Sequence, residues 1–218
     1  MIRAKHNRFA RLLFNFYIDR LLKKNFSHFY FLNDLPEIPA DAALILSPNH
    51  FSWWDGFFID FVNRKFLNRK IHVLMLENQL VKYWFFRFVG AFSIDLENKS
   101  TMITTFKYVK ELLADKQNVI VIYPQGKIEP FDSVSEIKEG VKLFANLSEK
   151  VFVLPVTFKI QFNEEMKPDV YSAFGNLTSN SEIKENFNIF KQRFLDAISK
   201  VDQISKSQTK LVDLFERH

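Results

Sequence analysis

The 218-residue sequence contains no cysteine. This excludes a disulfide framework, a cysteine-ligated zinc site and a thiol nucleophile. Glycine is also scarce: there are only five, widely spaced, at Gly56, Gly90, Gly126, Gly140 and Gly175. That spacing leaves no G-x-G-x-x-G, Walker A or G-x-S-x-G motif. Dinucleotide-binding enzymes, P-loop NTPases and standard α/β-hydrolases are therefore excluded.

Long apolar runs are missing as well. Leu12–Phe16 and Phe29–Leu32 are much shorter than the apolar core of a signal peptide or a span of ~20 residues, and arginines interrupt the region. We therefore expect neither a signal peptide nor a transmembrane span. The length is that of one ordinary domain, and 47% hydrophobic with 25% charged residues is the composition of a folded chain.

Aromatic residues are abundant and charge is unevenly placed. The 26 Phe, 3 Trp and 6 Tyr make up 16% of the chain, which is more than a soluble core requires. The net charge is +5, yet residues 1–25 hold seven basic residues against Asp19, or +6, so the remainder sums to −1. The sequence therefore describes a nearly neutral domain with a basic N-terminal segment, which argues against a nucleic-acid binder.

Residues 7–25 are predicted to form a helix with an apolar stripe, and most of its basic residues lie off that stripe. A basic amphipathic helix with aromatic residues is suited to the interface of an anionic membrane. The alternative is an ordinary helix whose stripe docks on the core. A second basic-aromatic stretch, residues 82–88, could pack inward or flank an acyl-chain entrance. The predicted membrane contacts are Phe9, Leu12, Leu13, Phe16, Trp84 and Phe85.

Short apolar runs alternate with helical patterns along the rest of the chain. The runs predict strands at 42–47, 71–76, 118–123 and 151–158, with a weaker one at 90–94; the helical patterns cover 54–68, 79–89, 100–114, 137–147 and 182–204. This alternation predicts an α/β domain with a mostly parallel central sheet covered by helices. We expect three segments: 1–35 for membrane contact, 36–204 as the domain, and 205–218 as a polar tail.

The first predicted strand runs directly into a turn that contains His50 and Asp55. Ligands in such sheets gather beyond the carboxyl ends of the strands. If the helix begins near Ser52, the two side chains can meet, and Asp55 can hold one ring nitrogen of His50 while the other acts as a base. The alternative is that Asp55 only caps the helix, because Ser52-x-x-Asp55 is close to a capping box.

The segment Asn49-His50-x-x-x-x-Asp55 resembles the signature of the lysophospholipid (glycerolipid) acyltransferase family, which includes the 1-acylglycerol-3-phosphate acyltransferases. Three further blocks resemble family blocks in the right order: Gly90–Asp95, Val121–Gly126 and Val153–Val156. The resemblance covers roughly residues 40–160. It implies the glycerolipid acyltransferase fold and transfer of a fatty acyl group from acyl-CoA or acyl carrier protein to a hydroxyl of a lipid acceptor.

The resemblance also implies residue roles. His50 is the expected base, and Asp55 fixes its tautomer and stabilises the imidazolium. Asn49, Gln125, Gly126 and Lys127 are the expected substrate-binding residues, with main-chain amides around Gln125 and Gly126 as candidates for oxyanion stabilisation. We expect no metal and no cofactor other than the acyl thioester co-substrate. The expected location is the cytoplasmic face of the cell membrane, as a peripheral protein on an anionic surface.

Two departures from the family pattern bear on the acceptor. Leu96 stands where the family usually has arginine, and Gln125-Gly126-Lys127-Ile128 stands where it usually has Glu-Gly-Thr-Arg. Arginine grips phosphate with a bidentate fork that neither replacement offers. The sequence therefore favours an acceptor without phosphate, such as a glycosylated or otherwise hydroxylated lipid. Lysophosphatidate, a thioester hydrolase reaction and a non-catalytic lipid-binding protein remain as alternatives.

Overall fold

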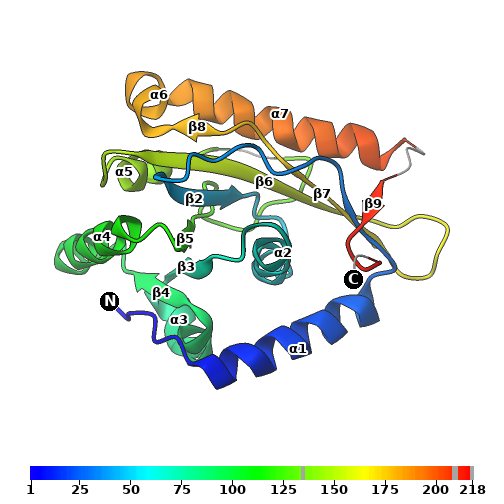
Figure 1. Cartoon of the computed structure of the whole chain (residues 1–218), viewed down its shortest axis with the longest axis horizontal. Helices are drawn as coiled ribbons and strands as arrows, with labels where there is room; N and C mark the ends of the chain where they lie inside the picture. Colours follow the sequence, from blue (N-terminus) through cyan, green and yellow to red (C-terminus); the bar gives the residue numbers. More distant parts are fainter. Residues whose placement is uncertain (134–135, 208–210, 217–218) are drawn as a thin grey trace.

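The computed structural model describes residues 1–133, 136–207 and 211–216. A central sheet carries the strand order β4-β3-β5-β2-β6-β7-β1-β9, with β8 paired to β6 (Figure 1). Strands β4 to β6 in this order run parallel, whereas β7 is antiparallel to β6. The bounds are β1 Phe29–Phe31, β2 Ala43–Pro48, β3 Lys70–Leu76, β4 Ala91–Ile94, β5 Asn118–Val121, β6 Val151–Gln161, β7 Asp169–Phe174, β8 Thr178–Ser179 and β9 Val212–Asp213.

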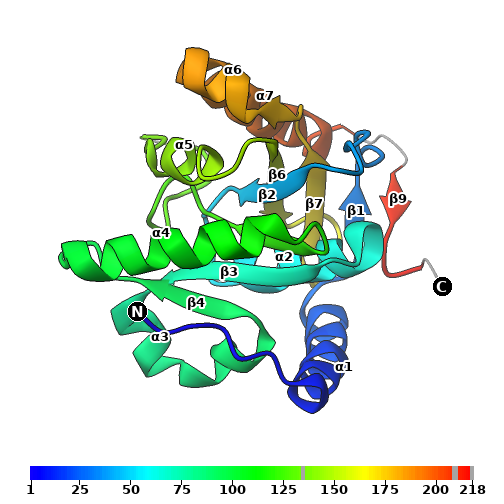
Figure 2. The same ribbon diagram turned by 60° about the vertical axis from the view of Figure 1, so that its left-hand side comes forward.

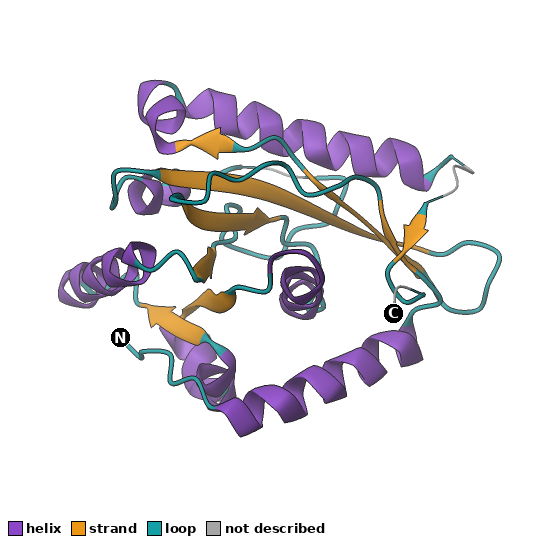
Figure 3. Cartoon of the chain, in the orientation of Figure 1, coloured by secondary structure: helices purple, strands orange, loops and turns teal. Residues whose placement is uncertain are grey.

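Helices cover both faces of this sheet (Figures 2 and 3). Their bounds are α1 Arg8–Asn25, α2 Asp55–Val62, α3 Glu77–Lys82, α4 Lys99–Ala114, α5 Gly140–Ala145, α6 Asn180–Glu185 and α7 Phe187–Ser205. A π-helical turn, η1 (Asn63–Leu67), continues α2, and a 3₁₀ helix, η2 (Trp84–Val89), follows α3. The prediction of a mostly parallel α/β sheet covered by helices, with an N-terminal helix before it, is confirmed.

The central strands are mostly apolar because each faces two cores. In β2, Leu44 and Leu46 belong to the core beneath α1 and α2, whereas Ala43 and Ile45 belong to the core beneath α4, α5 and α7. Successive side chains of a strand point to opposite faces, so a strand buried on both sides has few polar positions, and those that occur, such as Ser47 and Thr157, are buried. This is why the continuous apolar runs in the sequence located the central strands.

Four strands (β1, β7, β8 and β9) and two helix breaks were not predicted; one of the breaks divides the predicted helix at 79–89 into α3 and η2. Strands β1, β8 and β9 span only two or three residues, so no alternation can be recognised in them. The predicted helix at 182–204 is two helices, because the side chain of Asn186 accepts a hydrogen bond from the Asn188 amide and caps α7. The helical spacing of apolar residues continues across this break, so the spacing does not reveal it.

The division into three segments stays a prediction. Strand β1 lies in the first segment and β9 in the last, and they pair with each other in the same sheet. Residues 208–210 and 217–218 of the predicted tail lie outside the described residues. Within the described ranges, none of the helices combines the length and apolar character needed to cross a membrane.

The segment before α1 contacts β3 through two histidines, the half-buried His6 and the buried His72. The ring centroids of His6 and His72 lie 4.7 Å apart. Burial lowers the pKa of His6 to about 3 and that of His72 to about 4, and for His6 the neighbouring His72 adds to the effect. Because both groups bind protons more weakly in the folded state, acid favours the unfolded chain.

We predict that the free energy of unfolding falls as the pH drops from about 6.5 towards 4. Each histidine contributes a slope of at most about 1.4 kcal/mol per pH unit, and His6 contributes less because it is partly exposed. The variant His6→Leu should show a shallower fall. Urea unfolding at a series of pH values measures this, and parallel curves for the two proteins would contradict the assignment.

Candidate active site

His50 and Asp55 meet at the carboxyl end of β2. His50 lies in the turn after Pro48, and Asp55 is the first residue of α2. The His50 Nδ1 atom is 2.9 Å from Asp55 Oδ2, and the same oxygen accepts the main-chain N–H groups of Phe51 at 2.8 Å and Ser52 at 3.0 Å. Asp55 therefore pairs with the histidine and also holds the turn before the helix, while the cap residue of α2, Trp54, makes no side-chain cap bond.

The electrostatics of this pair follow from its burial. Asp55 is completely buried, and burial raises the pKa of its carboxyl, while the bonds from His50 and the Phe51 and Ser52 amides act in the opposite direction. The His50 side chain is 25% exposed. When Nδ1 carries the hydrogen that points at Asp55, the other ring nitrogen, Nε2, is unprotonated. It can then accept a hydrogen bond, which is the state that a general base requires.

Asn49 holds the His50 turn against the neighbouring strand β6. Its amide Nδ2 donates to the Phe158 carbonyl at 2.9 Å, and its Oδ1 accepts the Phe158 N–H at 2.8 Å. Asn49 is buried, and these bonds satisfy a main-chain pair that would otherwise be stranded. The structure therefore gives Asn49 a positioning role; direct contact with substrate stays a prediction.

The block that follows β5 holds the main chain of His50 from the other side. The buried Gln125 Oε1 accepts the His50 N–H at 2.6 Å, and the Glu129 N–H donates to the His50 carbonyl at 2.9 Å. Gly126 lies in this turn with φ +70°. Its N–H donates to the Tyr123 carbonyl at 3.1 Å, so this amide, expected near the oxyanion, is occupied here.

Lys127 is paired with a carboxylate that the sequence analysis did not single out. Its Nζ lies 3.2 Å from Glu129 Oε1, and the Gln125 amide reaches Glu129 Oε2 at 3.3 Å. Glu129 is buried, whereas the Lys127 side chain is 65% exposed. The only sequence signal was an acidic residue four positions after Gln125, and that spacing has no meaning outside a known turn.

Tyr123 is a second residue that the sequence analysis did not assign. Its ring centroid lies 4.3 Å from that of His50. The pKa of its hydroxyl is raised well above the ordinary value, first by burial and then by the charge of Asp55. The hydroxyl is therefore protonated at neutral pH and is a hydrogen-bond donor beside the His50–Asp55 pair. The available sequence signal was tyrosine in a block that the family usually begins with phenylalanine.

All six predicted membrane contacts are exposed. On α1 these are Phe9, Leu12, Leu13 and Phe16, and on η2 they are Trp84 and Phe85. Helix α1 packs on the core through Ile18 and Leu22 instead. The alternative in which the stripe docks on the core is therefore wrong for the four α1 residues, and inward packing is wrong for Trp84 and Phe85. We call these six residues, with the equally exposed Tyr17, the apolar face.

The elements that carry the apolar face are linked to the His50 turn through aromatic rings. The ring of Phe57 on α2 contacts Phe14 of α1, Phe86 of η2 and Trp53 of the His50 turn. Trp53 is itself exposed. One aromatic cluster thus connects α1 and η2 with the turn that carries the candidate base.

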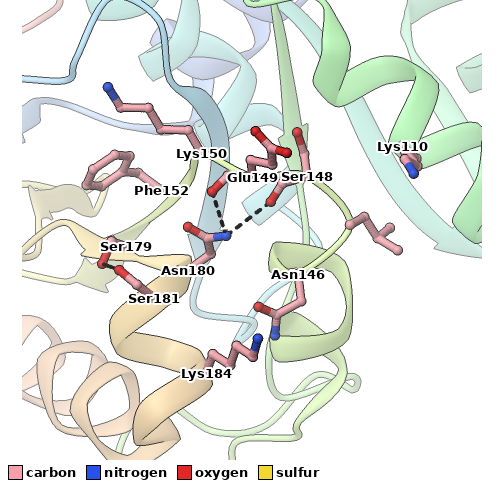
Figure 4. A pocket seen from close by; sticks show the side chains of 11 residues that line it. Lys110, Asn146, Ser148, Glu149, Lys150, Phe152, Ser179, Asn180, Ser181 and Lys184 are labelled. Carbon is pink, nitrogen blue, oxygen red and sulfur yellow. Dashed lines mark hydrogen bonds between the residues drawn. The ribbon is translucent and has the colours of Figure 1, made fainter.

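A groove elsewhere on the surface is separate from this site. It has a volume of about 810 Å³, and Figure 4 shows Asn180 bonded to the carbonyls of Ser148 and Glu149 within it. Ser148 and Glu149 come just before Val151, which pairs with Ala43 at the beginning of β2. His50 follows the other end of β2. None of the predicted site residues lines the groove.

A family model named Acyltransferase matches residues 30–159, which is more than half of the chain. The chain belongs to this acyltransferase family. It is also 28% identical over 136 residues to the 1-acyl-sn-glycerol-3-phosphate acyltransferase of Streptococcus pneumoniae (strain ATCC BAA-255 / R6), covering 61% of this chain and 47% of that protein. The chain thus spans about half the length of this curated relative.

A solved structure shows the same fold. The 1-acyl-sn-glycerophosphate (LPA) acyltransferase PlsC from Thermotoga maritima superposes with a TM-score of 0.62, covering 89% of this chain and 80% of that one. The sequences are 15% identical. The glycerolipid acyltransferase fold expected from the motif blocks is therefore confirmed.

Metal ligands do not gather in this site. Across the part of the chain that the structure describes, no three His, Cys, Asp or Glu side chains lie together in an arrangement that could bind a metal ion. The expectation of a reaction without metal or cofactor stays a prediction.

We predict that Asn49→Ala lowers the free energy of unfolding by about 2 kcal/mol, because it leaves the Phe158 amide and carbonyl without partners. It should also reduce turnover about tenfold, since the His50 turn loses its bond to β6. A matched control exists: Asn33 makes the same two bonds to the Phe174 main chain away from His50.

Asn33→Ala should therefore lower stability while leaving turnover of the folded enzyme unchanged. Denaturant unfolding and initial rates on both variants measure this. Equal losses of turnover in both would contradict a local role for Asn49.

Proposed function

We propose that the protein is an O-acyltransferase that moves a fatty acyl group from a thioester, acyl-CoA or acyl carrier protein, to a hydroxyl of a lipid at a membrane surface. The observation that carries the proposal is the His50–Asp55 pair at 2.9 Å in the turn after β2, at the carboxyl ends of the parallel strands. The family membership supports the reaction class.

The proposed mechanism uses His50 twice. As the acceptor hydroxyl oxygen attacks the thioester carbonyl carbon, Nε2 of His50 takes the hydroxyl proton, and Asp55 stabilises the imidazolium. The tetrahedral intermediate then collapses, the carbon–sulfur bond breaks, and His50 returns its proton to the departing thiolate. The ester and the free thiol result, with no covalent enzyme intermediate. A positioned base of this kind contributes about 10²–10⁴ in rate.

The charge around the acceptor turn favours a lipid without phosphate. Ile128 stands in the place of one of the family's arginines, and the preceding Lys127, in the place of the family's threonine, is paired with Glu129. Leu96, in the place of the other arginine, is exposed and apolar. A phosphate placed here would meet Lys127, which is already paired with Glu129, and Lys138, whose ammonium lies beside Gly126, but no bidentate donor at either arginine position. A sugar or other hydroxylated headgroup requires neither.

A second candidate is a 1-acylglycerol-3-phosphate acyltransferase of phospholipid synthesis. The Streptococcus pneumoniae relative carries that name and supports this alternative. Phosphate would then have to draw Lys127 away from Glu129, which gives up an existing ion pair in exchange for the new one. A non-catalytic lipid-binding protein is less favoured, because the base, its carboxylate and the bonds that orient both are present.

We further propose that the apolar face rests on the cytoplasmic side of the cell membrane. The apolar face consists of five exposed residues on α1 and two on η2. Helix α1 also carries basic side chains, including Arg8, Arg20 and Lys24. Aromatic residues enter the headgroup region while lysine and arginine bind anionic lipids. This would place the His50 turn close to the surface from which a lipid acceptor arrives.

We predict that His50→Ala loses at least about 10²-fold in turnover while membrane binding is unchanged, because only the base is removed. The protein has no cysteine, so a thiol-reactive dye reports CoA release from acyl-CoA without background. The assay should be run with no acceptor, with lysophosphatidate and with a neutral glycolipid, and with acyl carrier protein as a second donor.

Release that requires both the glycolipid and His50 supports the phosphate-free acceptor. Release with lysophosphatidate favours the second candidate, and release without acceptor indicates a thioester hydrolase. Full turnover by His50→Ala would overturn the mechanism.

We predict that replacing Leu12 and Phe16 by serine lowers partitioning onto vesicles with anionic lipid at least about tenfold, since each side chain loses its apolar burial in the interface. The matched control replaces Ile103 and Leu143, which are exposed apolar residues on other helices, by serine. Sedimentation with vesicles measures the partitioning. Equal binding by both double variants would show that the apolar face does not meet the membrane.

A further inference from the structure

The carboxylate of Asp55 is hydrogen-bonded unevenly. The ring of His50 and the amides of Phe51 and Ser52 all reach Oδ2. Within the described ranges, Oδ1 is buried and has no hydrogen-bond partner. A buried carboxylate oxygen without a hydrogen-bond donor lowers the stability of the folded state, because its bonds to water are lost and no bond within the protein replaces them.

The hydroxyl of Tyr123 is a hydrogen-bond donor that lacks an acceptor among the residues that the structure describes, and it too is buried. The Tyr123 ring lies against the ring of His50, with centroids 4.3 Å apart and planes at 32°. An unpaired donor and an unpaired acceptor thus flank the same histidine, one on the block after β5 and the other at the start of α2.

We propose that Tyr123 is a positioning residue for the His50–Asp55 pair: its hydroxyl donates to Oδ1 of Asp55, directly or through one bound water. This bond satisfies two buried groups at once. It holds the second oxygen of the carboxylate while His50 and the turn amides hold the first, so the carboxylate cannot rotate away from the histidine. The role in turnover rests on the proposed function of His50.

Other charged groups do not supply this contact. Glu129 touches His50 through main-chain atoms, and its carboxylate is engaged by Gln125 and Lys127. On α2 itself, Asp60 is paired with Arg11 and Arg64 from the opposite side. The influence of Asp55 on the Tyr123 hydroxyl agrees with their proximity, since the negative charge helps to keep the phenol protonated.

The direction of the effect can be derived. A donor on Oδ1 spreads and stabilises the negative charge of Asp55, which weakens its attraction for a proton on the pair. In Tyr123→Phe that donor is lost, so the pair holds its proton to higher pH. We expect the acidic limb of the kcat/KM profile to move up by about half a pH unit or more and kcat to fall several-fold.

A substrate-independent readout tests the same bond. The ring signals of His50 can be followed by NMR titration, with the assignment taken from their loss in His50→Ala. Tyr123→Phe should move the midpoint upward, whereas the control Tyr108→Phe, which removes another largely buried hydroxyl on α4, should leave it unchanged. An unchanged midpoint in Tyr123→Phe would overturn the proposal.

The Asp55→Asn background shows whether Tyr123 acts through Asp55. There the shift caused by Tyr123→Phe should largely disappear, because the charge it modulates is gone. A shift of the same size in both backgrounds would overturn the proposed route. If instead His50→Ala retained turnover while the NMR shift appeared as expected, the proposed function would fail and the Tyr123–Asp55 bond would stand.

Discussion

The buried carboxylate of Asp55 is the group around which the site is built. A charge with no exposed surface is tolerated only where donors converge on it, and three of them come from residues 50–52 of the turn that precedes it. The helix start, the turn and the base are therefore one unit. Because Asn49 ties this unit to β6 and Gln125 ties it to the block after β5, the base is placed correctly only when the parallel strands are in register.

The features that could be predicted from the sequence are those that depend on residues close together in the chain. The central strands were found because burial on both faces removes polar residues from them, and the His50–Asp55 pair was found because its members share one turn. The bond from Asn49 to Phe158 joins residues 109 positions apart, so no local pattern could reveal it. Glu129 was missed although its partners lie within four residues, because the fold of the turn, and not the spacing, brings them together.

Helix α1 shows a different limit of sequence patterns. It carries apolar residues on two faces, and a periodicity argument finds the stripe without telling which face the core takes. Ile18 and Leu22 are buried in the core, and Phe14 packs against it, whereas the more aromatic stripe faces outward. An exposed apolar stripe on an otherwise well-packed domain costs free energy in water, which is why such patches mark interaction surfaces.

Under the membrane contact proposed above, the position of the candidate base relative to this stripe connects the membrane with the chemistry. His50 is only one-quarter exposed, and Trp53 three residues later joins the aromatic cluster beneath α1 and η2. A lipid hydroxyl that stays near the interface could reach such a base with little removal of its acyl chains from the bilayer. In the proposed function, the turn's lack of arginine bears on selectivity: on an anionic surface, an acceptor turn with arginine forks would bind every phosphate headgroup, whereas one without them leaves recognition to hydroxyl groups.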